Sequence, residues 1–211
     1  MSDLQPRSDF QPVMRSPLHH FGLVERQASM HNGCGVWANE KSLLGYISLR
    51  GNSNLPAFLT KVNAALGVAL PTQPCTIQAA DWGSILWISP DEWLIVCERA
   101  QRQPLQQALE TALSGIHSQV VDNSGGYTWV ALQGTRIVDL LRHCTVYDVE
   151  NLTAGHVVGS TFGKLSTFIV RNHEGFHLVL RRSFADYIWR YLERSAAPYG
   201  FGIAAKITAK I

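Results

Sequence analysis

The segment Tyr46-Ile47-Ser48-Leu49-Arg50-Gly51 has a counterpart in Trp129-Val130-Ala131-Leu132-Gln133-Gly134, at an offset of 83 residues. Each segment is a short apolar run of the kind that forms a buried strand, and a helix-like stretch follows each of them. Further apolar pairs share the offset: Phe58 and Leu141, Trp93 and Phe176, Leu105 and Ile188, Leu109 and Leu192. This self-similarity predicts a duplicated fold, with chance agreement among strand-forming residues as the alternative.

Hydrophobic periodicity gives the order of elements in the first half. It predicts strands over 43–50, 84–88, 93–98 and 119–122, and helices over 54–66 and from about Pro104 to a stop at Gly115. Pro90-Asp91-Glu92 is typical of a turn, which makes the two middle strands a hairpin. The resulting order, strand-helix-strand-strand-helix-strand, is that of a ferredoxin-like unit.

The second half restarts the same order. It predicts a strand over 127–132, a helix over about 135–143, a hairpin of 165–171 with 176–181, and a last helix from Ser183. Ser183 with Asp186 resembles a capping box. No clear strand follows the last helix, so we expect the halves to complete each other's sheets. The sequence thus predicts an α+β fold of two interlocked, duplicated ferredoxin-like halves.

The chain divides into three regions by composition. Residues 1–17 are polar with three prolines, which favours an arm that is disordered or docks on another surface. Residues 18–200 form a single duplicated unit, with a first half at about 40–122 and a second at about 126–200. Residues 201–211 are expected to be a tail.

Composition excludes several classes of partner. The net charge is +2 without a basic run, so neither nucleic acid nor a membrane surface is expected as a partner. No apolar run approaches the length of about 18 residues that a membrane span needs, and we expect a cytoplasmic protein. Charged residues make up 16% of the chain beside six tryptophans, a balance that indicates either an interface or a large core. The four scattered cysteines indicate reduced thiols.

The segments that resemble catalytic or cofactor motifs lack the spacing or the residues that those motifs require. Gly159 to Lys164 is one residue too short for a phosphate loop and lacks its Ser or Thr, no G-x-G-x-x-G occurs, and Ser124 lacks the preceding glycine of a nucleophile elbow. We therefore predict no catalytic residue, no metal site and no cofactor site in this chain. Asp122 and Arg182 are weak candidates for an anion pocket, and an exposed strand end is the alternative.

Five longer segments of the sequence point to a family. They are Ser16-Pro17-Leu18, Gly45-Tyr46-Ile47-Ser48-Leu49-Arg50-Gly51, Leu86-Trp87-Ile88-Ser89-Pro90-Asp91-Glu92-Trp93-Leu94-Ile95-Val96, Val121-Asp122-Asn123-Ser124-Gly125 and Arg182-Ser183-Phe184-Ala185-Asp186-Tyr187-Ile188-Trp189. In this order they resemble the gamma subunit family of heterotetrameric sarcosine oxidase. The resemblance spans roughly 16–200.

The resemblance implies a non-catalytic subunit of an oxidoreductase complex. That complex demethylates sarcosine to glycine, with hydrogen peroxide and a folate-linked one-carbon product. The partners implied are alpha, beta and delta subunits, which hold FAD, FMN, NAD, tetrahydrofolate and zinc. The family also resembles the amino-terminal part of glycine-cleavage aminomethyltransferases, which implies their interlocked fold. Thr135 after Gly134 departs from the aminomethyltransferase pattern, which argues against independent catalysis.

Three functions follow as hypotheses. The first is a structural subunit that docks by apolar surface, with Trp37, Trp82 or Trp189 as anchors. The second is a free-standing folate-binding or aminomethyltransferase-like protein, for which Asp122 is the faint candidate for a pterin contact. The third is a ferredoxin-like regulatory module.

Overall fold

The structure, a computed structural model, describes residues 13–28 and 33–205. The predicted arm over 1–17 therefore lies mostly outside the described residues, as does the predicted tail beyond residue 205. The described residues form two sheets with helices on both, which confirms the α+β class.

The first half builds a five-stranded sheet within the described residues, in the order β4-β5-β6-β3-β7. Its elements, in chain order, are β3 (Gly45–Gly51), α1 (Pro56–Leu66), β4 (Ile77–Ala80), β5 (Gly83–Ser89), β6 (Glu92–Cys97), α2 (Arg102–Ala112) and β7 (Ser118–Asp122). A short 3-10 turn, η2 (Arg99–Gln101), leads into α2. With β4 set aside, the strand order and the two helices are those of a ferredoxin-like unit.

The second half builds a seven-stranded sheet within the described residues, in the order β1-β12-β2-β8-β11-β10-β9. Its elements are β1 (Gln27–Ala28), β2 (Val36–Lys41), β8 (Tyr127–Gln133), α3 (Ile137–Cys144), β9 (His156–Phe162), β10 (Leu165–Arg171), β11 (Phe176–Arg181), α4 (Ala185–Ala196) and β12 (Phe201–Ala204). Strand β2 precedes the whole first half in sequence, yet it pairs with β8 and β12. The second half's sheet is therefore built from chain segments on both sides of the first half, as an interlocked fold requires.

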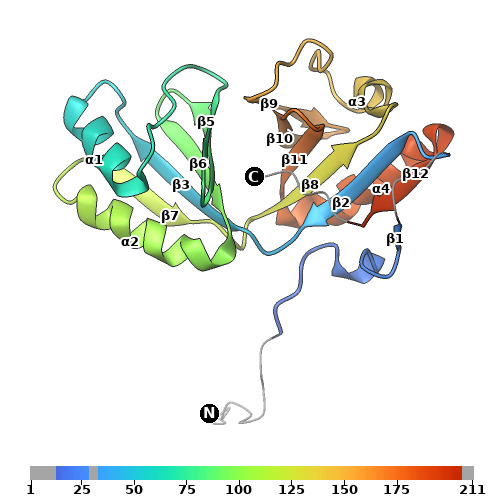
Figure 1. The fold of residues 1–211 in the computed structure, drawn as a ribbon, viewed down its shortest axis with the longest axis horizontal. Helices are drawn as coiled ribbons and strands as arrows, with labels where there is room; N and C mark the ends of the chain where they lie inside the picture. The colour runs from blue at the N-terminus through green and yellow to red at the C-terminus, as the bar shows by residue number, and fades with distance from the viewer. Residues whose placement is uncertain (1–12, 29–32, 206–211) are drawn as a thin grey trace, which may run out of the picture.

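The layers run helix, sheet, sheet, helix (Figure 1). Helices α1 and α2 cover the outer face of the five-stranded sheet, where Phe58, Trp93 and Leu109 are fully buried. Helices α3 and α4 cover the seven-stranded sheet, with Leu141 and Leu192 in its core. Phe58 and Leu141, which the offset of 83 residues pairs in the sequence, thus occupy matching places in the two halves.

The inner faces of the two sheets pack against each other. Alternate residues of β3 show this: Ile47 and Leu49 face the helices, whereas Tyr46 belongs to a separate apolar cluster with Trp129 and Val179 of the opposite sheet. An isolated bridge between Thr76 and His156 also joins the first half to β9. Because both halves contribute to this shared core, they form one structural unit.

Several details differ from the sequence prediction. Strands β1, β2, β4, β9 and β12 were not predicted, and β12 lies in the range expected to be tail. The last helix begins at Ala185 after a 3-10 turn, η3 (Arg182–Phe184), and makes no side-chain cap hydrogen bond, so the capping box was wrong. Asp186 instead bonds to His20 and Arg190.

Candidate functional site

A cavity of about 270 Å³ lies where the two halves and the N-terminal segment meet. We call it the arginine cavity and define it by six of its lining residues: Arg15, Arg99, Arg102, Ser124, Thr128 and Arg182. They come from the N-terminal segment, from η2 and the start of α2, from the turn before β8 with the start of β8, and from η3. The site therefore exists only when four separate parts of the chain are assembled.

Local structure fixes the positions of these arginines. The backbone N–H of Arg182 donates to the carbonyl of Gly126 at 2.8 Å, which ties η3 to the turn before β8. Gly45 lets α2 approach β3, since a Cβ there would lie 2.7 Å from the Cys97 Sγ and 2.9 Å from the Arg102 Cβ. Arg102 is thereby held against the sheet at the wall of the cavity.

The two residues singled out in the sequence are placed differently. Arg182 lines the arginine cavity, and its Nη2 donates to the carbonyl of Arg15 at 2.7 Å. Asp122 ends β7 and pairs with Arg102 at 2.9 Å, while the backbone N–H of Ser124 donates to its carboxylate. Burial alone would raise the pKa of Asp122, but the Ser124 hydrogen bonds and the charges of Arg102 and Arg99 lower it. Asp122 is thus an engaged, charged group, poorly suited to the pterin contact considered above.

A second carboxylate, that of Glu40 on β2, lies beside the cavity but outside its lining. The Thr128 hydroxyl donates to Glu40 at 2.5 Å, and Arg182 lies near enough to act on its charge. Burial raises the pKa of Glu40 above its ordinary value, and the bonds from Ser16 and Thr128 only partly offset this. The sequence analysis missed Arg15, Arg99 and Arg102, because isolated arginines from three segments form no motif.

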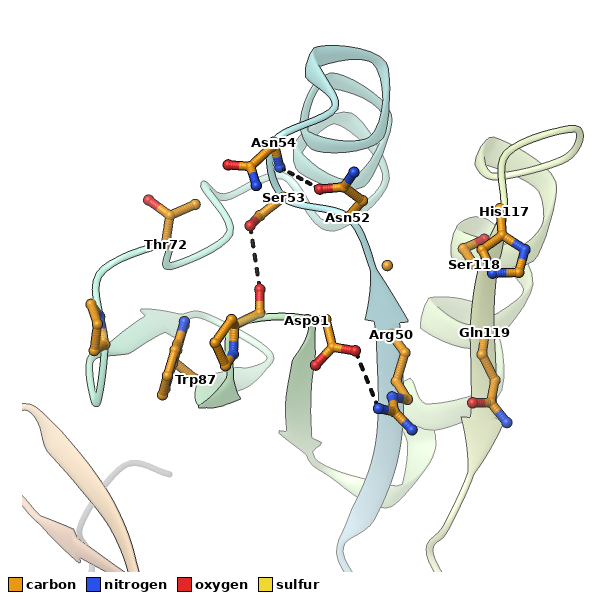
Figure 2. Close-up of a pocket in the computed structure, with 13 residues that line it drawn as sticks. Arg50, Asn52, Ser53, Asn54, Thr72, Trp87, Asp91, His117, Ser118 and Gln119 are labelled. Atoms are coloured by element: carbon orange, nitrogen blue, oxygen red, sulfur yellow. Dashed lines mark hydrogen bonds and ion pairs between the residues drawn. The ribbon is translucent and has the colours of Figure 1, made fainter.

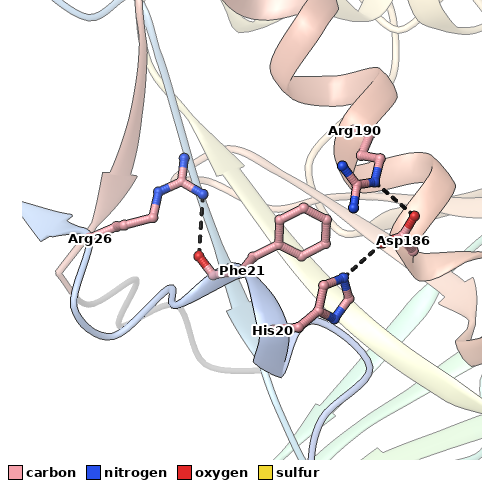
Figure 3. Close-up of polar contacts among 5 residues, drawn as sticks. All are labelled: His20, Phe21, Arg26, Asp186 and Arg190. Carbon is pink, nitrogen blue, oxygen red and sulfur yellow. Dashed lines mark hydrogen bonds and ion pairs between the residues drawn. The ribbon is translucent and has the colours of Figure 1, made fainter.

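The N-terminal segment that forms one wall is held on α4 (Figure 3). His20 Nε2 lies 2.7 Å from Asp186, and Arg190 donates to the same carboxylate at 2.9 Å. The Arg190 guanidinium also lies over the Phe21 ring, 5.1 Å from its centroid. Arg26 pairs with Glu193 one turn further along the helix, at 2.7 Å. The segment is therefore docked along α4 by polar contacts around one aromatic ring.

A second cavity, of about 850 Å³, lies at the end of the five-stranded sheet (Figure 2). The loop between β3 and α1, the turn between β5 and β6, and the start of β7 surround it. Arg50 points to Asp91, at 3.2 Å, and lies 3.9 Å from Glu92. A hydrogen bond from Ser89, followed by the contact with Arg50, lowers the pKa of Asp91. The positive charge of Arg50 is therefore neutralised by the neighbouring carboxylates of Asp91 and Glu92.

Residues suited to nucleophilic catalysis are present in this second cavity but are not arranged for it. His117 directly precedes Ser118, the first residue of β7, yet the Ser118 hydroxyl donates to the carbonyl of Ile116 at 3.0 Å. A nucleophile needs a base within hydrogen-bond reach of its hydroxyl. The arrangement supports binding of a polar group more readily than acyl transfer.

The thiols and possible metal ligands of the described residues show no arrangement for chemistry. Cys97 and Cys144 are buried free thiols, and burial raises the pKa of Cys97 to about 11. Thiolates are the reactive form of cysteine, so Cys97 is chemically inert at neutral pH. Within residues 13–28 and 33–205 no group of three or more His, Cys, Asp or Glu side chains gathers as metal ligands do.

A groove of about 450 Å³ with both polar and apolar lining residues runs between the end of α3, the β9–β10 turn and α4. We call it the Tyr187 groove and define it by its lining residues: His143, Cys144, Thr145, Val146, Gly163, Lys164, Tyr187, Tyr191 and Arg194. Val146 is 89% exposed and Tyr187 is 42% exposed, and the Tyr187 ring stacks on Tyr191 with centroids 6.1 Å apart. Exposed apolar groups at this density are typical of a contact surface.

Two of the three tryptophans proposed as docking anchors are buried. Trp37 and Trp189 are 2% and 1% exposed, so their apolar surface is already covered by this chain and the anchor hypothesis was wrong for both. Trp82 is partly buried against the core of the first half, where its indole N–H donates to the carbonyl of Leu66. As an anchor, Trp82 stays a prediction.

Comparisons with known proteins agree with this architecture. The model of the sarcosine oxidase, gamma subunit family matches residues 50–198. A sarcosine oxidase subunit gamma from Arthrobacter sp. is 28% identical over 175 residues, which cover 82% of this chain and 84% of the relative. No described helix is long and apolar enough to cross a membrane.

Solved structures share the fold. A chain of the heterotetrameric sarcosine oxidase from Corynebacterium sp. U-96 superposes with a TM-score of 0.80 and 22% identity, covering 92% of this chain and 99% of that one. Aminomethyltransferase T of the glycine cleavage system from Bartonella henselae superposes with a TM-score of 0.59 and 17% identity over 89% of this chain. This chain spans about half of that enzyme, 51% of its length. With a family match over most of its length, the chain belongs to the sarcosine oxidase gamma subunit family.

Proposed function

We propose that this chain is the non-catalytic gamma subunit of a cytoplasmic sarcosine oxidase complex and acts by assembling with its cofactor-bearing partners. The family match over residues 50–198 carries the proposal. The partners are alpha, beta and delta subunits, and they hold the FAD, FMN, NAD, tetrahydrofolate and zinc. The complex oxidatively demethylates sarcosine to glycine, with hydrogen peroxide and a folate-linked one-carbon product.

The Tyr187 groove is the contact surface that we assign to this assembly. Its apolar centre is Val146 and Tyr187, and its charged lining residues are Lys164 and Arg194, both cations. We propose that a neighbouring oxidase subunit covers it with an apolar side chain ringed by carboxylates. Apolar burial would supply affinity and the charge pairs orientation.

The test is affinity purification of the tagged full-length chain from its native host. We expect stoichiometric partner subunits and a flavin absorption spectrum in the eluate. Val146→Glu should lower partner recovery at least tenfold, because it buries a carboxylate in an apolar contact. Leu55→Glu, at a side chain 42% exposed on the other half, is the matched control and should leave recovery unchanged. A colourless eluate without partners would overturn the proposal.

The free-standing folate-binding function is not favoured by the comparisons, and the ion pair of Asp122 with Arg102 removes its one candidate contact. A folate-dependent rise in the melting temperature of the isolated chain would reopen it.

A further inference from the structure

The arginine cavity holds more positive than negative charge. Arg15, Arg99, Arg102 and Arg182 line it, and its lining includes no carboxylate. Asp122 and Glu40 are the carboxylates whose charges act on these arginines, the first through Arg102 and Arg99 and the second through Arg182. Two carboxylates against four guanidinium groups leave a formal excess of two positive charges. Since burial also disfavours the charged form of Glu40, the positive excess grows at lower pH.

One donor at the site has no partner. The Nε of Arg102 is buried and makes no hydrogen bond within the described part of the chain, although the same side chain pairs with Asp122 through Nη1. A buried donor left unpaired costs free energy, which an acceptor placed against it would recover. Arg99 likewise makes no ion pair among the described residues, so its fork of donors is available.

The size and chemistry of the cavity define the class of ligand. At about 270 Å³ it is smaller than the cavities that hold drug-sized cofactors, which begin near 300 Å³. Guanidinium groups match tetrahedral oxyanions through paired N–H donors. The Ser124 hydroxyl is already engaged, since its oxygen accepts from the Tyr46 N–H and it also bonds to the Asp122 carboxylate, so the arginines are the donors left for a ligand.

We propose that the arginine cavity binds a small phosphate-class oxyanion, which links the N-terminal segment, the start of α2 and η3. Arg99 and Arg102 supply the first half's donors and Arg182 the second half's. The occupant is either free phosphate or the phosphate group of a small ester. The cavity shares no lining residue with the Tyr187 groove, and its proposed ligand does not depend on the proposed assembly.

The experiment uses the full-length chain and inorganic phosphate as the probe. Calorimetric titration at constant ionic strength, with chloride as the replacement ion, should give a dissociation constant below about 1 mM. Arg99→Gln and Arg182→Gln should each raise that constant by about tenfold or more, because each removes charge-assisted hydrogen bonds. Arg50→Gln is the matched control, since Arg50 lines the other polar cavity, and it should bind phosphate as the unchanged chain does.

Each result of the phosphate titration either supports or overturns the proposal. Absence of binding at 20-fold the expected constant, or equal loss in Arg50→Gln, would overturn the proposal. If Arg182→Gln fails to fold, Arg99→Gln and Arg182→Lys carry the test, because Lys keeps the charge without the fork and should give an intermediate constant. Glycerol phosphate distinguishes the two sources: binding as tight as that of inorganic phosphate indicates an ester, and its exclusion indicates the free ion.

Discussion

At the scale of single residues, His177 is held neutral by its surroundings. It is 2% exposed, and its Nε2 lies 2.7 Å from the amide nitrogen of Asn172. The side-chain amide oxygen of Asn172 accepts hydrogen bonds from the backbone N–H groups of Glu174 and Gly175. These bonds fix the orientation of the amide, so its N–H₂ group donates to the imidazole. Burial, with the charge of Lys41 second, lowers the pKa of His177 to about 3.

This neutral histidine makes stability depend on pH. The unfolded chain binds a proton on His177 below about pH 6.5, whereas the folded chain does not until about pH 3, so stability falls as the pH falls through that window. Between pH 7 and pH 5 we expect the wild type to lose about 2 kcal/mol more of its unfolding free energy than His177→Gln. Urea unfolding of both chains at both pH values measures the difference. Equal losses would mean that His177 ionises normally in the folded state.

Gly134 shows a different residue-scale constraint. Its φ is +124°, and a Cβ there would lie 2.2 Å from the carbonyl oxygen of Gly35. Gly134→Ala should therefore cost about 3 kcal/mol or more in chemical denaturation. Gly67→Ala is the matched control, because Gly67 also has a positive φ, +71°, but has open space around it, and it should cost about 1–2 kcal/mol. Similar costs at both sites would show that backbone strain, not the contact with Gly35, governs Gly134.

At the scale of elements, the N-terminal segment is held by apolar as well as polar contacts. Leu18 is fully buried in the core beneath α4, which surrounds it with side chains of the second half. Leu18→Ala should cost about 2–5 kcal/mol and speed tryptic cleavage after Arg26, because the segment loses its anchor. Val13→Ala, at a side chain 73% exposed, should change neither. Unchanged cleavage in Leu18→Ala would mean that the contacts drawn in Figure 3 are sufficient to hold the segment without the Leu18 side chain.

Sequence periodicity predicted the elements that have local signatures. The β10–β11 hairpin was predicted with the bounds that the structure has, because apolar strands flank an Asn-His-Glu-Gly turn. Strands β1 and β12 are too short for a period to be read, and β2 carries Asn39, Glu40 and Lys41 in place of apolar alternation. The structure shows why β2 tolerates them: Asn39 donates to the carbonyl of Ala204, and Glu40 accepts from Thr128. Such partners are distant in sequence and cannot be read from a local window.

The same limit applies to the candidate site. Arg182 was singled out with Asp122 as a candidate for an anion pocket, but the arginine cavity depends on Arg15 and Arg99 being brought beside it from other segments. The prediction of a capping box was wrong for a related reason, since the Asp186 carboxylate bonds to His20 and Arg190 instead. Tertiary contacts decide both cases.

At the scale of the whole molecule, the two sheets depend on each other for burial. Tyr46, Leu94 and Val96 of the first half are covered by Trp129 and Val179 of the second. A fragment limited to residues 42–125 should therefore expose this face. We expect it to bind a hydrophobic dye and to elute as aggregates, whereas the full chain at the same concentration binds none. A monomeric fragment without dye binding would contradict the single-unit architecture.

Strand β2 also sets an order on synthesis at the ribosome. It lies between β8 and β12, and the bond from Asn39 to Ala204 joins residues 165 positions apart. The strands of the five-stranded sheet leave the exit tunnel directly after β2 and can pair as they emerge, since domains generally form as the chain is made. Strand β2 emerges before all of them, finds its first neighbour only when β8 has been translated, and gains its second neighbour, β12, only with the last residues of the fold. A ribosome that stalls shortly before residue 201 therefore holds a nascent chain with one completed sheet and one open edge, which is the species on which chaperones would act.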